Sequence, residues 1–223
     1  MKSNFIKYFK YSIYLYVLIG FSSAFSGSYE DFFTAIKRDD AGVVQQLLAR
    51  GFDANTLDPQ KQHGLLLAIR EPSPKVIKAL LAAPKLDLNA LNDKGESPLM
   101  LAAFNGDLEL ASQMIQKGAD VNKTGWTPLH YAATKGHLPL MKLFIENHAY
   151  IDAESPNGST PLMMASMYGS AEAVKLLLDE GADPLLKNQQ GLTATQFAQR
   201  VSRQDVADMI AKSARGKRPA GQW

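Results

Sequence analysis

The sequence predicts an all-α repeat solenoid of about six helix-turn-helix units joined by β-hairpin fingers. Three observations lead to this prediction. Segments similar to TGWTPLHYAATKGH (residues 124–137) recur along the 223-residue chain. They recur with a period close to 33 residues, and the same residue types return at the same places in each copy. Self-similarity at such a period is typical of repeat architectures.

The copies align on a proline position and on an alanine four residues after it. The proline position is taken by Asp31, Gly64, Pro98, Pro128, Pro161 and Ala194, and the alanines are Ala35, Ala68, Ala102, Ala132, Ala165 and Ala198. The successive spacings are 33, 34, 30, 33 and 33 residues. Since alanine is present in all six copies, each first helix is expected to have a small face that lets the next unit approach closely.

Within a unit, each element has its own local signal. A glycine turn precedes a Ser or Thr N-cap, such as Thr127, and a first-turn proline that lacks an N–H to leave unpaired. The motif L-x-x-A-A then predicts a short helix that ends at a glycine such as Gly136. A second apolar helix follows and ends at a C-cap glycine such as Gly118 or Gly181. The segment ADVN leads into an extended hairpin and the next copy.

This unit, with TPLHYAA at the helix start, resembles the ankyrin repeat. The resemblance covers residues 28–211, within a predicted domain over 27–211. The predicted repeats are 28–57, 58–91, 92–122, 123–154, 155–187 and 188–211. Repeats one, two and six are degenerate, as expected of terminal units with one face against solvent. The finger that contains NKTGW is three residues shorter than the others, which explains the spacing of 30.

The first 26 residues have the pattern of a secretory signal peptide. Lys2, Lys7 and Lys10 precede an uncharged apolar run, and small residues follow it. We expect cleavage after Ser26, with Ala24 as the alternative, and export of the mature chain. An uncleaved membrane anchor is the other interpretation, although the apolar run is short for a membrane span. At the other end, residues 212–223 are predicted to form a basic, flexible tail.

Charge and cysteine content exclude several classes of function. The signal segment holds three of the 24 basic residues and the tail holds four, which leaves 17 basic against 22 acidic residues in the body. A body with a net charge of −5 does not indicate nucleic-acid binding. The absence of cysteine excludes disulfides, thiolate catalysis and cysteine metal ligands, and it suits an oxidising compartment.

The motifs that usually indicate catalysis are missing. No G-x-S-x-G elbow, phosphate-binding loop or dinucleotide fingerprint is present. His130 follows the cap Thr127 by three residues, where a histidine in ankyrin-like units bonds around the cap, and His137 follows the inter-helix glycine. His63 and His148 lie in other repeats, with no carboxylate at the metal-ligand spacing of H-E-x-x-H. We therefore expect no enzyme, cofactor or metal site; an enzyme built on His130 and His137 is the alternative.

The resemblance implies that fingers and inner-helix ends line a concave face that binds a partner protein. The positions that vary in such repeats lie five, four and two residues before the proline, and six and seven after it. The predicted partner-binding residues are Lys94, Glu96, Phe104, Asn105, Trp126, Thr134, Lys135, Asn157, Met167 and Tyr168. Asp93, Lys123, Thr124, Pro156 and Ser159 complete these positions. Aromatic residues there suit interface hot spots, although Trp126 could instead pack against a neighbouring finger.

Exported bacterial ankyrin proteins suggest two roles by resemblance. One is an immunity protein that blocks a toxin acting in the cell envelope, and the other is a helper of a periplasmic catalase in peroxide defence. A scaffold with many weak partners is the third possibility. The expectation is a periplasmic chain that is a monomer when free, with membrane contact only through an uncleaved signal segment.

Overall fold

The computed structural model describes residues 27–215, and the predicted signal peptide lies outside the described residues. The chain divides into two compact units after Leu86. The first unit contains a helix described over residues 27–37, followed by α2 (Ala41–Ala49), α3 (Gly64–Arg70) and α4 (Pro74–Leu81). These helices form the first two of six helix pairs in the described chain.

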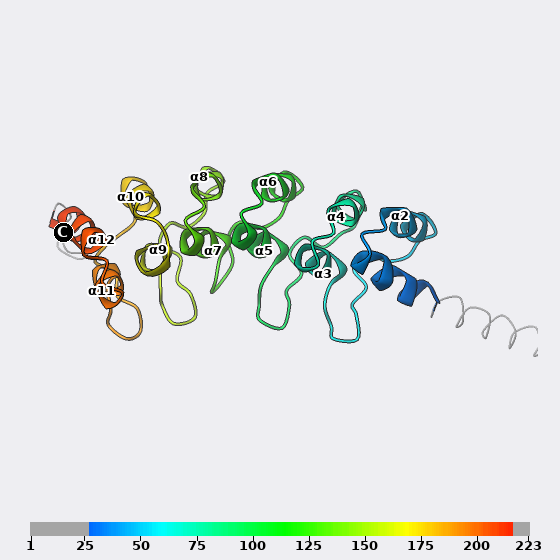
Figure 1. Ribbon diagram of the computed structural model, residues 1–223, viewed down its shortest axis with the longest axis horizontal. Helices are drawn as coiled ribbons and strands as arrows, with labels where there is room; N and C mark the ends of the chain where they lie inside the picture. The colour runs from blue at the N-terminus through cyan, green and yellow to red at the C-terminus, as the bar shows by residue number, and fades with distance from the viewer. Residues whose placement is uncertain (1–26, 216–223) are drawn as a thin grey trace, which may run out of the picture. The chain divides into compact units, whose positions relative to one another are not determined.

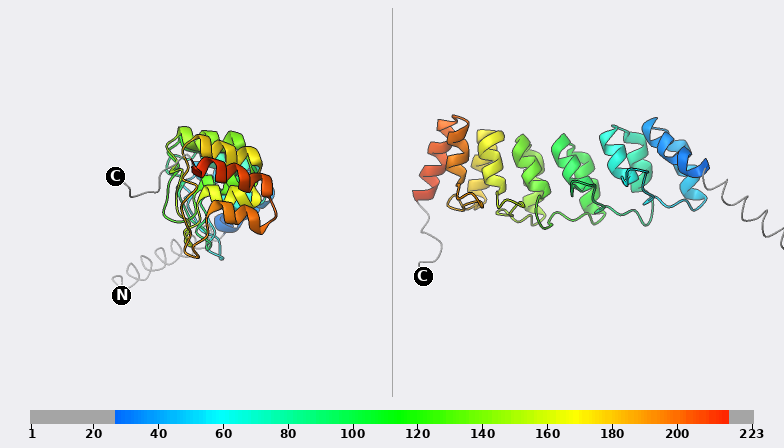
Figure 2. Two further views of the ribbon diagram at one scale, coloured as in Figure 1. Left: turned by 90° about the vertical axis from the view of Figure 1, so that its left-hand side faces the viewer. Right: turned by 90° about the horizontal axis from the view of Figure 1, so that it is seen from below.

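The second unit contains four further pairs. They are α5 (Pro98–Asn105) with α6 (Leu108–Gln116), α7 (Pro128–Lys135) with α8 (Leu138–Glu146), α9 (Pro161–Tyr168) with α10 (Ala171–Asp179), and α11 (Ala194–Arg200) with α12 (Gln204–Arg215). Within this unit, the first helices of the pairs pack side by side in one row (Figure 1). The second helices form another row, and the fingers project from the first row (Figures 1 and 2).

The predicted caps begin the inner helices. Ser97 Oγ accepts the Met100 N–H at 3.3 Å, and Thr160 Oγ1 accepts that of Met163 at 3.4 Å. In each case the side chain of the third helical residue accepts the N–H of the cap residue in return. The sulfur of Met100, for example, lies 3.3 Å from the Ser97 nitrogen. These reciprocal bonds satisfy N–H groups that have no partner inside the helix.

The repeated alanines lie where the helices meet. Ala68, Ala102, Ala132, Ala165 and Ala198 are fully buried, and Ala35 is 3% exposed. The prediction of a small, buried face in all six copies is therefore confirmed. A methyl group at this position leaves room for the adjacent helix, and a close-packed interior tolerates little extra volume.

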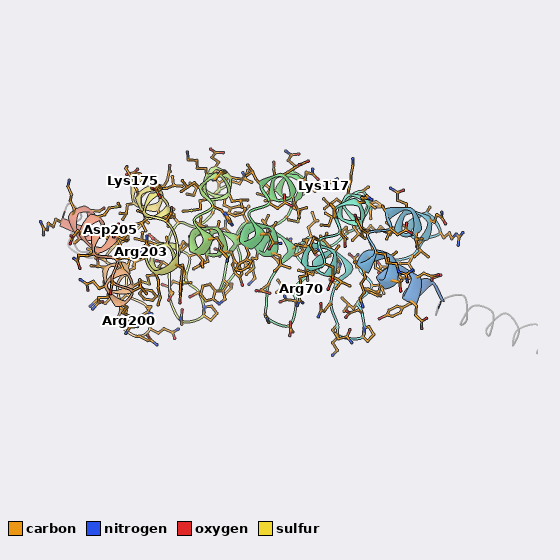
Figure 3. The ribbon with its side chains drawn as sticks, viewed as in Figure 1. Arg70, Lys117, Lys175, Arg200, Arg203 and Asp205 are labelled. Carbon is orange, nitrogen blue, oxygen red and sulfur yellow. The ribbon has the colours of Figure 1, made fainter. Side chains whose placement is uncertain are left out.

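Within the second unit, side chains link each repeat to its neighbour at two levels. At the start of a second helix, His137 Nε2 lies 3.3 Å from the Phe104 carbonyl oxygen. Arg203 Nη1 donates in the same way to the carbonyls of Ala165 and Ser166, both at 3.1 Å (Figure 3). At the base of a finger, Asn122 Nδ2 donates to the His148 carbonyl at 2.8 Å. Consecutive repeats are thus joined by directional bonds as well as by apolar packing.

The fingers differ from the β-hairpins that the sequence predicts. No β-strand forms between residues 27 and 215, and the only bridge there is the antiparallel pair Leu57 and His63. Each long finger is instead closed by two backbone bonds that share one residue: for example, Ser155 N–H donates to the Ser159 carbonyl at 3.0 Å, and Gly158 N–H donates to the Ser155 carbonyl at 2.8 Å. Side chains occupy the next bonding positions: Asn92 Oδ1 accepts the Lys94 and Glu96 N–H groups. These side-chain bonds replace the second backbone hydrogen bond that an antiparallel pair of residues makes in a β-hairpin.

α12 continues to Arg215, so the last helix extends past the predicted repeat boundary at 211 into the predicted tail. No helix within residues 27–215 has the length and apolar character needed to cross a membrane.

Candidate functional site

The predicted binding residues lie in the second unit, on the fingers and at the ends of the inner helices. Phe104 is 44% exposed and Tyr168 is 59% exposed. Lys94, Asn105, Lys135 and Asn157 are also exposed, whereas Glu96, Trp126, Thr134 and Met167 are half-buried. We call these ten residues the partner face. Ser159, one of the other varying positions, is 1% exposed and therefore does not contribute to this surface.

An aromatic cluster connects two neighbouring repeats of the partner face, the third and the fourth. Tyr131 in α7 is at its centre: its ring centroid lies 6.2 Å from that of Phe104 and 6.5 Å from that of Trp126, both edge to face. The Tyr131 hydroxyl donates to Glu96 Oε1 at 2.9 Å. Trp126 also packs edge to face on His130, with centroids 5.2 Å apart. Trp126 thus packs on α7 of its own repeat, whereas the alternative interpretation placed it against a neighbouring finger.

Two lysines lie at the ends of this cluster. The Lys135 ammonium is 4.1 Å from the centroid of the Phe104 ring, a distance at which the ring quadrupole attracts a cation. The Lys123 ammonium donates to the carbonyls of Thr124 at 3.0 Å and Trp126 at 3.4 Å. No carboxylate of the described residues pairs with either ammonium group.

Glu96 is the acid closest to the aromatic rings. Its Oε2 accepts from Asn92 Nδ2 at 2.7 Å, while its Oε1 accepts from Tyr131. Burial raises the pKa of Tyr131, and the bond to Glu96 and its negative charge raise it further. Tyr131 therefore stays protonated at neutral pH and acts as a donor. Both oxygens of Glu96 are engaged, so this acid orients Tyr131 and is not a free base.

The remaining predicted residues are separate from the cluster. Asn157 Oδ1 accepts from the Ser155 hydroxyl at 2.7 Å and from the Ser159 N–H at 3.1 Å, which makes it a finger-forming residue. Thr134 Oγ1 donates to the His130 carbonyl at 2.7 Å, within its own helix. Tyr168 and Met167 lie at the end of α9, in the next repeat. The predicted row of aromatic and thioether groups therefore has two parts, the Tyr131 cluster and the end of α9.

His130 has the structural role predicted for it. It is fully buried; Nδ1 lies 3.2 Å from the Thr127 nitrogen and 2.9 Å from Thr127 Oγ1, and Nε2 lies 2.9 Å from the Ser159 carbonyl oxygen. Nε2–H must donate to that carbonyl, so Nδ1 accepts the Thr127 N–H. Burial lowers the pKa of His130 to about 4, which keeps the ring neutral at pH 7. Both ring nitrogens are occupied: Nδ1 bonds to the cap of its own helix, and Nε2 joins that helix to the next repeat.

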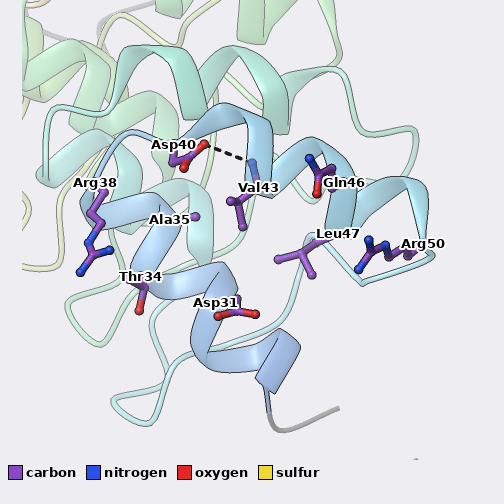
Figure 4. A pocket seen from close by; sticks show the side chains of 9 residues that line it. All are labelled: Asp31, Thr34, Ala35, Arg38, Asp40, Val43, Gln46, Leu47 and Arg50. Atoms are coloured by element: carbon purple, nitrogen blue, oxygen red, sulfur yellow. Dashed lines mark hydrogen bonds between the residues drawn. The ribbon is translucent and has the colours of Figure 1, made fainter. Parts of the chain in front are cut away.

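The first unit contains a further concave place with charged side chains. A hollow of about 290 Å³ lies between the helix over 27–37 and α2 (Figure 4). It presents Asp31 and Asp40 beside Arg38 and Arg50, and Asp40 is already bonded to the Val43 N–H. Within residues 27–215, no three His, Cys, Asp or Glu side chains form a group that could hold a metal ion. The hollow has no excess of either charge to select a ligand.

Comparison with known proteins identifies the class. A family model described as ankyrin repeats in three copies matches residues 32–124, 65–155 and 136–219. The chain therefore belongs to the ankyrin-repeat family. This membership, together with the stacked helix pairs, defines a protein-binding scaffold.

Among individual proteins, the chain is similar to the putative ankyrin repeat protein YahD of Escherichia coli (strain K12). The two are 28% identical over 190 residues, which cover 81% of this chain and 94% of YahD. It is also 38% identical over 116 residues to the mouse ankyrin repeat and SAM domain-containing protein 6, covering 50% of this chain and 13% of that protein. The chicken nuclear factor NF-kappa-B p105 subunit is 32% identical over 163 residues, covering 69% and 16% respectively. The chain thus spans less than a fifth of the two vertebrate relatives.

Tyr131 is the residue of this surface that sequence reasoning missed. It lies outside the positions expected to vary, yet it contacts Glu96, Phe104 and Trp126. A signal was available in the sequence. Tyr131 precedes Lys135 by four residues, and residues four apart share one face of a helix.

Proposed function

We propose that the protein is exported and binds one partner protein through the partner face, without catalysis. The observation that carries this proposal is the exposure of Phe104 and Tyr168 at the ends of two inner helices, α5 and α9, in a family of binding scaffolds. Large exposed aromatic side chains bury much area at little conformational cost when a partner docks. The histidines are engaged in bonds between repeats, which argues against an enzyme built on them.

The proposed location is the bacterial periplasm, after removal of the segment that ends near Ser26. Its support is the order of lysines, apolar run and small residues at the N-terminus, together with the absence of cysteine. The E. coli relative supports a bacterial setting for repeats of this length. N-terminal sequencing of the protein purified from periplasm tests both points, and a mature chain that keeps Lys2–Lys10 would contradict them.

Removing two exposed aromatic side chains should weaken partner binding. We expect Phe104→Ala and Tyr168→Ala each to reduce the binding free energy by about 1–3 kcal/mol. The thermal midpoint should barely change, because neither ring is part of the buried core: Phe104 is 44% exposed and Tyr168 is 59% exposed. The measurement is capture of a partner from periplasmic extract by tagged residues 27–223, compared with capture by the double variant.

The outcomes of that capture separate the candidate roles. One stoichiometric partner held by the unaltered chain and lost by the double variant supports a dedicated binder. A toxin as the partner identifies an immunity protein, and a catalase identifies a helper in peroxide defence. Equal capture by both forms would place binding elsewhere, and many substoichiometric partners would indicate a general scaffold.

A further inference from the structure

Two lysine ammonium groups of the second unit are held in place without a carboxylate partner. Lys135 is held over the Phe104 ring, and Lys123 is held by two backbone carbonyls. A lysine that is already ordered loses less side-chain entropy when it meets an anion than one that is free in solvent. Each ammonium has three donors, and these contacts leave some of them available.

The separation along the backbone between the cap that Lys123 contacts and Lys135 follows from the length of α7. The Lys123 ammonium is bonded to the carbonyl just before the cap Thr127, whereas Lys135 is the last residue of the helix. Eight residues at 1.5 Å each separate the cap from Lys135, a length of about 12 Å. An extended chain covers that length in about four residues.

Trp126, Tyr131 and Phe104 lie between the two cations and form a continuous edge-to-face series. Glu96 adds a negative charge at the middle of this series, through its bond to Tyr131. An acidic side chain would be repelled at the middle, while an apolar one would contact the rings. The surface therefore presents positive, apolar and positive sites in order along α7.

We propose that this surface binds an extended protein segment with two acidic side chains about four residues apart and an apolar residue between them. One carboxylate pairs with Lys123 and the other with Lys135, and the apolar side chain packs on Phe104 and Tyr131. This inference rests on the proposed function, and it specifies the chemistry of the partner.

The test selects a random library of 12-residue displayed peptides on residues 27–223. Peptides selected on the unaltered chain should be enriched in Asp or Glu at two positions three to five residues apart. Selection on Lys123→Glu/Lys135→Glu should reverse that preference to Lys or Arg. A synthetic acidic peptide should bind this variant at least about tenfold more weakly, and its binding to the unaltered chain should weaken as salt rises.

The control variant is Lys117→Glu/Lys142→Glu, which makes the same change in charge. These lysines are exposed at the end of α6 and on α8, in the other row of helices. It should select the same acidic peptides as the unaltered chain. If both charge-reversed variants lose the acidic peptide equally, the effect is one of net charge and the proposal of a lysine pair fails.

Three results would overturn the inference, and a fourth separates it from the proposed function. Absence of any binding peptide, or selected peptides without a pair of acids, contradicts the proposed occupant. So does an acidic preference that persists in Lys123→Glu/Lys135→Glu. Peptides that bind Phe104→Ala/Tyr168→Ala as tightly as the unaltered chain show that the partner face itself is wrongly placed.

Discussion

Substituting Gly169 with alanine should destabilise the second unit by about 3 kcal/mol, near the upper end of the usual overpacking effect. Gly169 follows α9, and a Cβ atom at this position would collide with the carbonyl oxygen of Ala133 in the preceding repeat. The backbone there is extended, with φ −82° and ψ −171°, so alanine is not disfavoured by conformation. The expected loss comes from the close approach of the two repeats.

Urea unfolding followed by circular dichroism measures this loss. The adjacent variant Tyr168→Ala is the control, because its side chain is exposed and alanine favours a helix. It should change the free energy of unfolding by less than about 0.5 kcal/mol. A Gly169→Ala protein as stable as the control would mean that α7 and α9 can move apart at little cost in free energy.

Acid should weaken the fold through His130. The pKa of this ring is lowered by burial to about 4, from an ordinary value of 6.5. Between these values the unfolded chain binds a proton that the folded chain excludes, so the free energy of unfolding falls as pH falls. The stabilisation is complete above pH 6.5 and is lost progressively as pH falls toward 4. At about 1.4 kcal/mol per pH unit, the total is about 3 kcal/mol.

The variant His130→Gln isolates this effect from the titration of carboxylates. Gln196 occupies the equivalent position in the last repeat, where its Oε1 accepts the Thr193 N–H at 2.9 Å. Glutamine can therefore retain the cap without titrating. Unfolding curves at pH 7, 5.5 and 4 should show a smaller loss of stability in the variant, by up to about 3 kcal/mol at pH 4. Parallel pH profiles would show that His130 is protonated in the folded chain.

Much of the fold could be predicted from sequence because each repeat carries its own local signals. Thr127 and Pro128 predict a helix start, and the alanines four residues after the proline positions predict a small buried face. The structure confirms both. The prediction of β-hairpin fingers was wrong, because side chains such as that of Asn92 accept hydrogen bonds from the backbone of the turn. A turn-forming sequence alone does not distinguish a β-hairpin from a loop whose turn is closed by side-chain hydrogen bonds.

The exposure of residues on the partner face was predictable from the sequence, and their contacts with one another were less so. Phe104 and Tyr168 are exposed as expected of the partner face. Tyr131 was not selected, because its contacts depend on how its ring lies against the preceding repeat. Ser159 was expected at the surface and is buried, with its carbonyl bonded to His130.

The sequence by itself determined the period, the helix starts, the buried alanines and the family, since all of these depend on residues close together in the chain. Tertiary structure decided which side chains meet across a distance of about one repeat. Glu96 meets Tyr131, Lys135 meets Phe104, and Gly169 lies against Ala133 only because one helix pair packs on another. The physical reason is that a period specifies which units are neighbours, while packing specifies the angle and distance at which their side chains touch.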